Sequence, residues 1–205
     1  MQRLVKIIAL ITIFLISSFT FVYPQLQEYS IVNFKTVPGL PTKIAYSVFK
    51  DSKGFMWFGT ETGLYRWDGI DYKIFRYDPD DSTSISGNMI GRILLEDNDG
   101  NLWIGTRSSG LNIYNPSTES FTRFSRSPDY LFDFDFNRIH LALQDKNGEV
   151  WLASQWISGV INFNKSSDSF TIYRVNSDTL DSKANMTSSM YEDEAGRFWI
   201  GTLQG

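Results

Sequence analysis

The sequence contains no cysteine and only one histidine among its 205 residues. Without cysteine the chain has no disulfide, no thiolate metal site, no cysteine nucleophile and no N-terminal cysteine for lipid attachment. The single histidine, His140, removes most histidine-based metal sites and catalytic triads. Basic residues are also scarce, because 19 Lys and Arg stand against 23 Asp and Glu. The resulting net charge of −4 argues against nucleic acid as a partner.

Aromatic residues, by contrast, make up 16% of the chain, and tryptophan marks a motif that occurs four times. The motif reads Asp, two residues, Gly, two residues, Trp, and its tryptophans lie 46, 48 and 48 residues apart. This period is typical of one four-stranded propeller blade. We expect Asp to cap a tight turn, Gly to supply a positive φ, and Trp to pack one blade on the next. The copies are Asp51, Gly54, Trp57; Asp97, Gly100, Trp103; Asp145, Gly148, Trp151; and Asp193, Gly196, Trp199.

The sequence therefore predicts an all-β fold of propeller blades with four antiparallel strands each. The blades span about residues 40–87, 88–136, 137–185 and 186–205. Three full blades and part of a fourth make an incomplete ring, so we expect a fragment of a longer protein. Links between blades, at 78–88, 125–137 and 176–185, are polar and turn-rich, and are expected to be surface loops.

Details of the repeats predict how the strands lie. Paired apolar residues precede each motif Asp and predict a first strand that is buried on both faces and innermost in the ring: Val48 and Phe49, Leu94 and Leu95, Ala142 and Leu143, Met190 and Tyr191. A small residue two places after each Trp is expected to allow close packing of blades: Gly59, Gly105, Ala153 and Gly201. In three repeats, seven positions separate the aromatic residue that closes the third strand from the first apolar residue of the fourth strand: Trp67 to Ile74, Tyr114 to Phe121, Phe163 to Phe170.

The N-terminus has the pattern of an export signal. Arg3 and Lys6 precede the apolar run Ile7–Ile16, and small and polar residues follow. Residues 1–25 are therefore predicted to be a signal peptide, or an uncleaved anchor because Leu4–Val22 approaches the length of a membrane span. In both cases residues 26–205, the partial propeller, would lie in the periplasm or outside the cell. Tyr29–Phe34 is predicted to be a strand that completes the final blade.

Three stretches suggest chemistry but have a plainer structural interpretation. Asp97–Gly100 begins like a calcium loop, yet the downstream bidentate Glu is missing. Asp133 and Asp135 could share one face of a strand, as glycosidase carboxylates might, although a solvated strand face is favoured. His140 lies within an expected inner strand. We predict no catalytic residue, no metal site and no cofactor.

The repeats resemble a known family, the two-component regulator propeller repeat of extracytoplasmic sensors. The resemblance covers roughly Tyr29–Gly205 and is clearest in DSKGFMWFGTETGLYRWDG and DNDGNLWIGTRSSGLNIYNP. The third copy departs from it, with LAS for IGT and GV for GL. The resemblance implies seven-bladed propellers, an immunoglobulin-like domain, a membrane span and a histidine kinase. It further implies a kinase-linked parent that forms a dimer, and sensing of carbohydrate fragments.

A ligand surface is predicted from the geometry of a blade. Loops between second and third strands, and the links between blades, emerge on the same face of a propeller. That face would collect the candidate ligand-binding residues Glu61, Arg107, Tyr130, Gln155 and Trp156. Trp156 would either stack on a sugar ring or pack between loops.

These observations favour one function and leave two alternatives. The favoured function is the N-terminal part of a periplasmic, carbohydrate-responsive sensor in two-component signal transduction. This chain is not expected to be an enzyme itself, and its full-length parent is expected to be a sensor histidine kinase. The alternatives are a secreted propeller enzyme, such as a lyase or glycosidase, and a structural interaction propeller.

Overall fold

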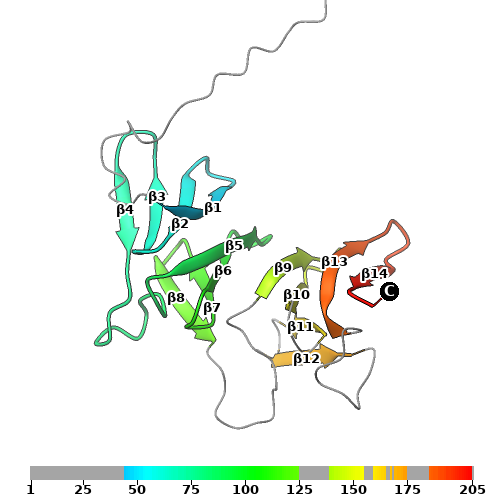
Figure 1. The fold of residues 1–205 in the computed structure, drawn as a ribbon. Helices are drawn as coiled ribbons and strands as arrows, with labels where there is room; N and C mark the ends of the chain where they lie inside the picture. Colours follow the sequence, from blue (N-terminus) through cyan, green and yellow to red (C-terminus); the bar gives the residue numbers. More distant parts are fainter. Residues whose placement is uncertain are drawn as a thin grey trace, which may run out of the picture. The chain divides into compact units, whose positions relative to one another are not determined.

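The computed structural model describes residues 44–124, 139–154, 159–164, 167, 169–174 and 185–204 (Figure 1). Several predicted features lie outside these residues: the export signal, the strand Tyr29–Phe34, the link 125–137 with Asp133 and Asp135, and nearly all of the link 176–185. Within the described ranges no helix has the length and apolar character needed to cross a membrane.

Within the described residues, fourteen strands form four antiparallel sheets in chain order, as the period of the motif predicts. We name the sheets blades 1 to 4. In the first three, each strand pairs with the next along the chain, and in the fourth two strands pair. Blade 1 comprises β1 (Ala45–Lys50), β2 (Met56–Thr60), β3 (Leu64–Trp67) and β4 (Tyr72–Phe75); blade 2 comprises β5 (Ile90–Glu96), β6 (Leu102–Thr106), β7 (Leu111–Asn115) and β8 (Ser120–Phe124); blade 3 comprises β9 (Ile139–Gln144), β10 (Val150–Ser154), β11 (Val160–Asn164) and β12 (Ser169–Tyr173); blade 4 comprises β13 (Thr187–Glu192) and β14 (Phe198–Thr202).

First strands approach one another from blade to blade: β1 contacts β5, β5 contacts β9, and β9 contacts β13. This arrangement agrees with an inner position for these strands. The prediction that they are buried on both faces is wrong, however, since Val48 is 57% and Tyr191 62% exposed. A first strand is an edge strand of its own sheet, so its burial depends on neighbouring blades. Leu94 and Leu95, with described blades on both sides, are half-buried.

The apolar core lies between successive sheets. One cluster joins Trp57 and Phe75 of blade 1 to Ile93 and Tyr114 of blade 2. A second cluster, which includes Trp103, joins blades 2 and 3 in the same way. Trp57 and Trp103 therefore each face the blade that follows them, as predicted.

The link between blades 1 and 2 is mostly exposed, but it is more than the predicted surface loop. Ile85, in the middle of this polar stretch, is fully buried in the first apolar cluster. The link therefore contributes a side chain to the core between the blades. A lone isoleucine among polar residues was the only sign of this in the sequence.

The small residue after the motif tryptophan has the predicted role at Gly59. A Cβ there would come within 2.8 Å of Ile90 Cγ2 in the next blade and 2.5 Å of Ser47 Oγ. A Cβ at Gly105 would make only ordinary contacts, the nearest at 3.6 Å. Close packing of the blades thus requires glycine at position 59, whereas position 105 has room for a Cβ.

The spacing of seven positions corresponds to a cross-strand pair in blades 2 and 3 but not in blade 1. Trp67 pairs with Tyr72, five positions on, while Ile74 pairs with Tyr65. The strands of this hairpin end earlier because Asp68 caps a turn directly after Trp67, and its Oδ1 accepts the amides of Ile70 and Asp71. In the other two blades the residues seven positions apart are cross-strand partners: Tyr114 with Phe121, and Phe163 with Phe170.

Candidate functional site

The aspartate of the motif joins the turn to the tryptophan in all four repeats. Its Oδ2 accepts the indole N–H of the tryptophan six residues later, at 2.7, 3.1, 2.9 and 2.9 Å in chain order. Its Oδ1 accepts the amide of the residue four positions on. The motif glycines have φ values of 92°, 79°, 84° and 78°, as predicted. The aspartates are thus structural, and their bond to tryptophan was not foreseen.

These hydrogen bonds affect the acidity of Asp193 in the fourth repeat. The Trp199 indole N–H and the Arg197 amide lower the pKa of the Asp193 carboxyl to about 2. The Arg197 guanidinium also lies 2.7 Å from Asp193 Oδ2. The ionised form is therefore the one that the turn stabilises.

A second contact, which we call the turn clip, connects each blade to the next. The residue directly before a motif Asp accepts a hydrogen bond from the amide directly after the preceding motif Asp. The three clips are Ser52 N to Glu96 Oε2 at 2.7 Å, Asn98 N to Gln144 Oε1 at 2.8 Å, and Lys146 N to Glu192 Oε2 at 3.0 Å. In blade 1 the same position is Lys50, which carries a donor in place of an acceptor.

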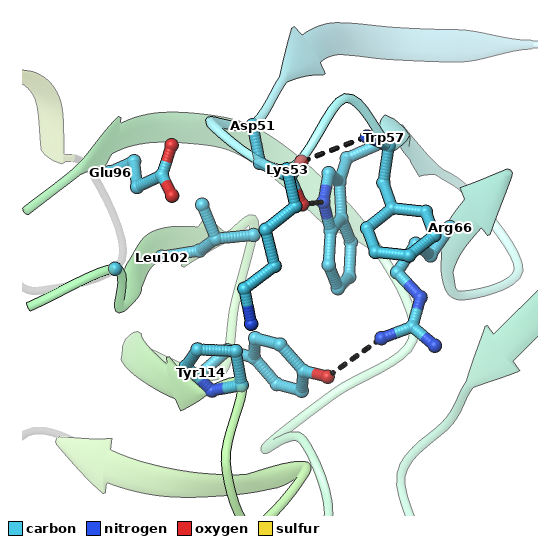
Figure 2. Close-up of a pocket in the computed structure, with 10 residues that line it drawn as sticks. Asp51, Lys53, Trp57, Arg66, Glu96, Leu102 and Tyr114 are labelled. Atoms are coloured by element: carbon cyan, nitrogen blue, oxygen red, sulfur yellow. Dashed lines mark hydrogen bonds between the residues drawn. The ribbon is translucent and has the colours of Figure 1, made fainter. Parts of the chain in front are cut away.

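Figure 2 shows the residues that line a small pocket between blades 1 and 2, at the end of the sheets where the motif turns lie. Its cavity volume is only about 30 Å³. Arg66 Nη1 lies 3.2 Å from Tyr114 Oη and 3.1 Å from Glu119 Oε1, so it connects both blades. A hydrogen bond from Lys73, supported by Arg66, lowers the pKa of Glu119. Because Trp57 and Tyr114 are buried, these groups act as a brace between blades rather than as an open site.

The calcium interpretation of Asp97 finds no support in the geometry. Both of its carboxylate oxygens accept hydrogen bonds, from the indole of Trp103 and from Asn101. Nowhere in the described ranges do three or more acidic or histidine side chains gather as metal ligands would. His140 lies in β9, where burial lowers the pKa of its imidazole and Arg92 donates to its carbonyl.

We call the opposite end of the sheets the loop face. Here second strands pass into third strands, and fourth strands pass into the next blade. A buried threonine closes the loop in blades 1 and 2: Thr60 Oγ1 donates to the Gly63 carbonyl at 2.8 Å, and Thr106 Oγ1 to the Gly110 carbonyl at 2.9 Å. The final Thr of the Trp-x-Gly-Thr sequence thus holds the loop that the candidate ligand residues occupy.

Of the candidate ligand residues, Glu61 and Arg107 are described, and both are exposed. Arg107 lies over the ring of Tyr46, 5.0 Å from its centroid, and its amide donates to the Met89 carbonyl. Glu61 makes no hydrogen bond or ion pair with any residue in the described ranges. The structure therefore places two predicted residues in loops of the loop face but does not join them. Tyr130, Gln155 and Trp156 lie outside the described residues.

The loop face also holds a pocket that sequence reasoning missed. It has about 390 Å³ of empty space between blades 3 and 4. Its lining includes Tyr173 and Arg174 at the end of β12, Asn185 and Thr187 at the start of β13, and Ile200 in β14. Two nitrogens of Arg174, Nε and Nη2, are buried without a hydrogen-bond partner. Tyr173 and Arg174 occupy the same positions of the repeat as Phe75 and Arg76, and this repeated pair was the available sign in the sequence.

The sequence matches the family model of the two component regulator propeller at residues 39–62, 84–108 and 181–204. In order, the three stretches contain the first, second and fourth copies of the motif. Three of the four repeats of this chain match the two component regulator propeller. The third repeat, with its altered LAS sequence, lies outside the matched stretches.

Known proteins similar to this chain include a histidine kinase, by sequence, and an extracellular domain, by fold. The chain is 37% identical over 62 residues to "Histidine kinase P4" of Formosa agariphila, across 30% of this chain and 4% of that protein. Its fold is similar to the extracellular domain of a hybrid two component system of B. thetaiotaomicron, with a TM-score of 0.62 and 21% identity. That similarity covers 86% of this chain and 29% of the other.

A virginiamycin B lyase from Staphylococcus aureus has a similar fold, with a TM-score of 0.54 and 13% identity over 80% of this chain and 51% of the lyase. At such identities the two structural similarities establish the propeller fold alone. The repeats of this chain span only a small part of the kinase relative and less than a third of the extracellular domain.

Proposed function

We propose that this chain is the ligand-sensing propeller portion of an extracytoplasmic sensor in a two-component system. The observation that carries the proposal is the match of its repeats to the two component regulator propeller. The kinase relative supports the proposal, because it is a much longer protein that is named a histidine kinase and is similar to part of this chain. In this proposal the propeller receives the signal and a kinase elsewhere in the parent transmits it.

We further propose that the ligand is an oligosaccharide and that it binds at the loop face. The support is chemical: an exposed arginine and glutamate stand in two loops, and a pocket lined by an aromatic ring, hydroxyl groups and a guanidinium opens between blades 3 and 4. Sugars are commonly bound by aromatic faces together with a few well-placed polar groups. Tyr130, Gln155 and Trp156 remain proposed contacts on the same face.

Isothermal titration calorimetry with the purified chain tests this proposal. The probes are a panel of plant and animal oligosaccharides of two to six units, half of them neutral and half acidic. We expect saturable heat with at least one member, reduced by Arg107→Ala or by Trp156→Ala. Absence of binding across the panel would overturn the carbohydrate proposal. A lyase or glycosidase would instead be recognised by cleavage of the probe, which chromatography of the titrated mixture would detect.

A further inference from the structure

We propose that Arg66, Lys73 and Glu119 form an ionic joint that holds the outer hairpin of blade 1 on blade 2 and loosens at high salt. Arg66 lies in β3 and Lys73 in β4, whereas Glu119 lies in the turn between β7 and β8. Both cations contact the one carboxylate. Arg66 Nη1 lies 3.1 Å from Glu119 Oε1, and Lys73 Nζ forms an ion pair with Glu119 Oε2. The proposal concerns the contact between two blades and does not depend on the sensing function.

The two cations of the ionic joint are neighbours within blade 1. Arg66 and Lys73 lie directly opposite each other in the antiparallel pair of β3 and β4. The Cβ atoms of such pairs are about 5 Å apart, and like charges placed there destabilise a sheet. The carboxylate of Glu119 binds both cations and so offsets their repulsion. The outer hairpin of blade 1 therefore depends on an acidic group that the next blade supplies.

The backbone of Glu119 is a second, independent observation. Its φ is 53°, the one positive value among the non-glycine residues in the described ranges. Residues with a Cβ rarely adopt this conformation, because it costs free energy that the surrounding structure must offset. The corresponding hairpin turn of blade 1 uses Gly69 for its positive φ. A glutamate in this conformation indicates that its carboxylate is needed at that place.

The other two complete blades show the same position of the repeat without the cations. The cross-strand pair that corresponds to the two cations is Ile113 and Thr122 in blade 2, and Asn162 and Thr171 in blade 3. Neither pair contains a charged side chain. Ile113 instead packs against the apolar cluster between blades 2 and 3. The contact between blades 1 and 2 should therefore respond to salt more strongly than the next contact along the chain.

The ionic joint is open to dissolved ions, whereas the core beside it is not. The side chains of Lys73 and Glu119 are 44% and 40% exposed. Salt weakens pairs of exposed charges, because the Debye length falls from about 30 Å at 0.01 M to about 3 Å at 1 M. Beneath the joint, Trp57 packs on Tyr114 with ring centroids 5.0 Å apart (Figure 2). We therefore expect salt to open the outer hairpin while the core between the blades persists.

Hydrogen exchange of the purified chain, followed by mass spectrometry at about 0.01 M and about 1 M sodium chloride, tests the ionic joint. We expect the amides of β4 to exchange about 3- to 10-fold faster at high salt, as the loss of exposed ion pairs would give. The amides of β12, the outer strand of blade 3, should keep their rate. Glu119→Gln should give β4 the fast rate at both salt concentrations. Glu194→Gln is the matched control, because it removes the same charge from an exposed turn in blade 4 and should keep the salt response of β4.

Two results would overturn the inference: a rate for β4 that does not depend on salt in the wild-type chain, and a salt response that survives Glu119→Gln. Should Glu119→Gln not fold, Glu119→Gly replaces it, because glycine accepts the positive φ and also lacks the carboxylate. The glycine variant should likewise lose the salt response. No sugar takes part in this experiment, so its failure leaves the sensing proposal in place. Failure of the oligosaccharide titrations would in turn leave the ionic joint in place.

Discussion

The first and fourth repeats contain the same motif with the same hydrogen bonds, yet their tryptophans have opposite environments. Trp57 is 1% exposed, whereas Trp199 is 58% exposed. Both donate their indole N–H to the motif aspartate, at 2.7 and 2.9 Å. The local turn therefore forms in each repeat by itself, and the burial of its tryptophan comes from the next blade. Local structure and packing are separable in this protein because different residues supply them.

The most direct way to break this comparison is to remove each tryptophan. Trp57→Ala should lower the free energy of unfolding by about 3 to 5 kcal/mol, because a large buried side chain leaves a cavity between two blades. Trp199→Ala should cost no more than about 1 kcal/mol, since most of its ring is already in water. Urea unfolding of both variants measures the difference. Equal losses would mean that the turn, and not the next blade, determines the contribution of the tryptophan.

Removing the aspartate should give a smaller version of the same contrast. Asp97→Ala leaves the buried indole N–H of Trp103 unpaired and should cost about 2 to 3 kcal/mol. In Asp193→Ala the affected indole is that of Trp199, which is already exposed to water. Water can replace the lost acceptor there, so we expect a smaller loss of stability. Thermal unfolding of the two variants at neutral pH checks the order. A larger loss for Asp193→Ala would contradict the role assigned to burial.

The turn clip gives a weaker test of contacts between blades. Glu96→Ala removes both hydrogen bonds to Ser52, which have lengths of 2.7 and 2.6 Å, and should cost about 1 kcal/mol. Lys50→Ala changes the same position in blade 1, where the described residues form no clip, and should be neutral to within about 0.5 kcal/mol. Urea unfolding again provides the measurement. A neutral Glu96→Ala variant would show that the clip is replaced by water without loss.

The smallest expected effect concerns pH in the exposed repeat. Since the folded state lowers the pKa of Asp193 from 3.8 to about 2, the ionised carboxylate stabilises the fold at neutral pH. That contribution is complete above the ordinary pKa and is lost as the pH falls from about 4 toward 2. Asp193→Asn should therefore show a shallower fall in melting temperature over this window than the wild-type chain. Parallel curves for the two proteins would remove Asp193 from the acid response.

The period of the motif was enough to predict the blades, because the Asp-Gly-Trp spacing determines a turn and the start of a strand locally. It predicted the turn glycines and the direction in which Trp57 and Trp103 face. Contacts between repeats were less predictable. Glu96 looked like an ordinary polar residue at a strand end, and only the juxtaposition of two blades reveals its bond to Ser52.

The candidate site was harder to predict than the fold. Loop positions such as Glu61 and Arg107 follow from topology, but their neighbours depend on how adjacent blades pack. Arg174 was missed because an arginine after a strand is chemically unremarkable until its partners are known.

At the position directly before the motif aspartate, blade 1 differs from the other three blades. Glu96, Gln144 and Glu192 can each accept a hydrogen bond from the preceding turn, whereas Lys50 cannot. The four repeats are therefore not interchangeable modules. A circularly permuted or shuffled gene that placed blade 1 after another of these blades would create a seam without a clip, and a Lys50→Glu change would be the first repair to try.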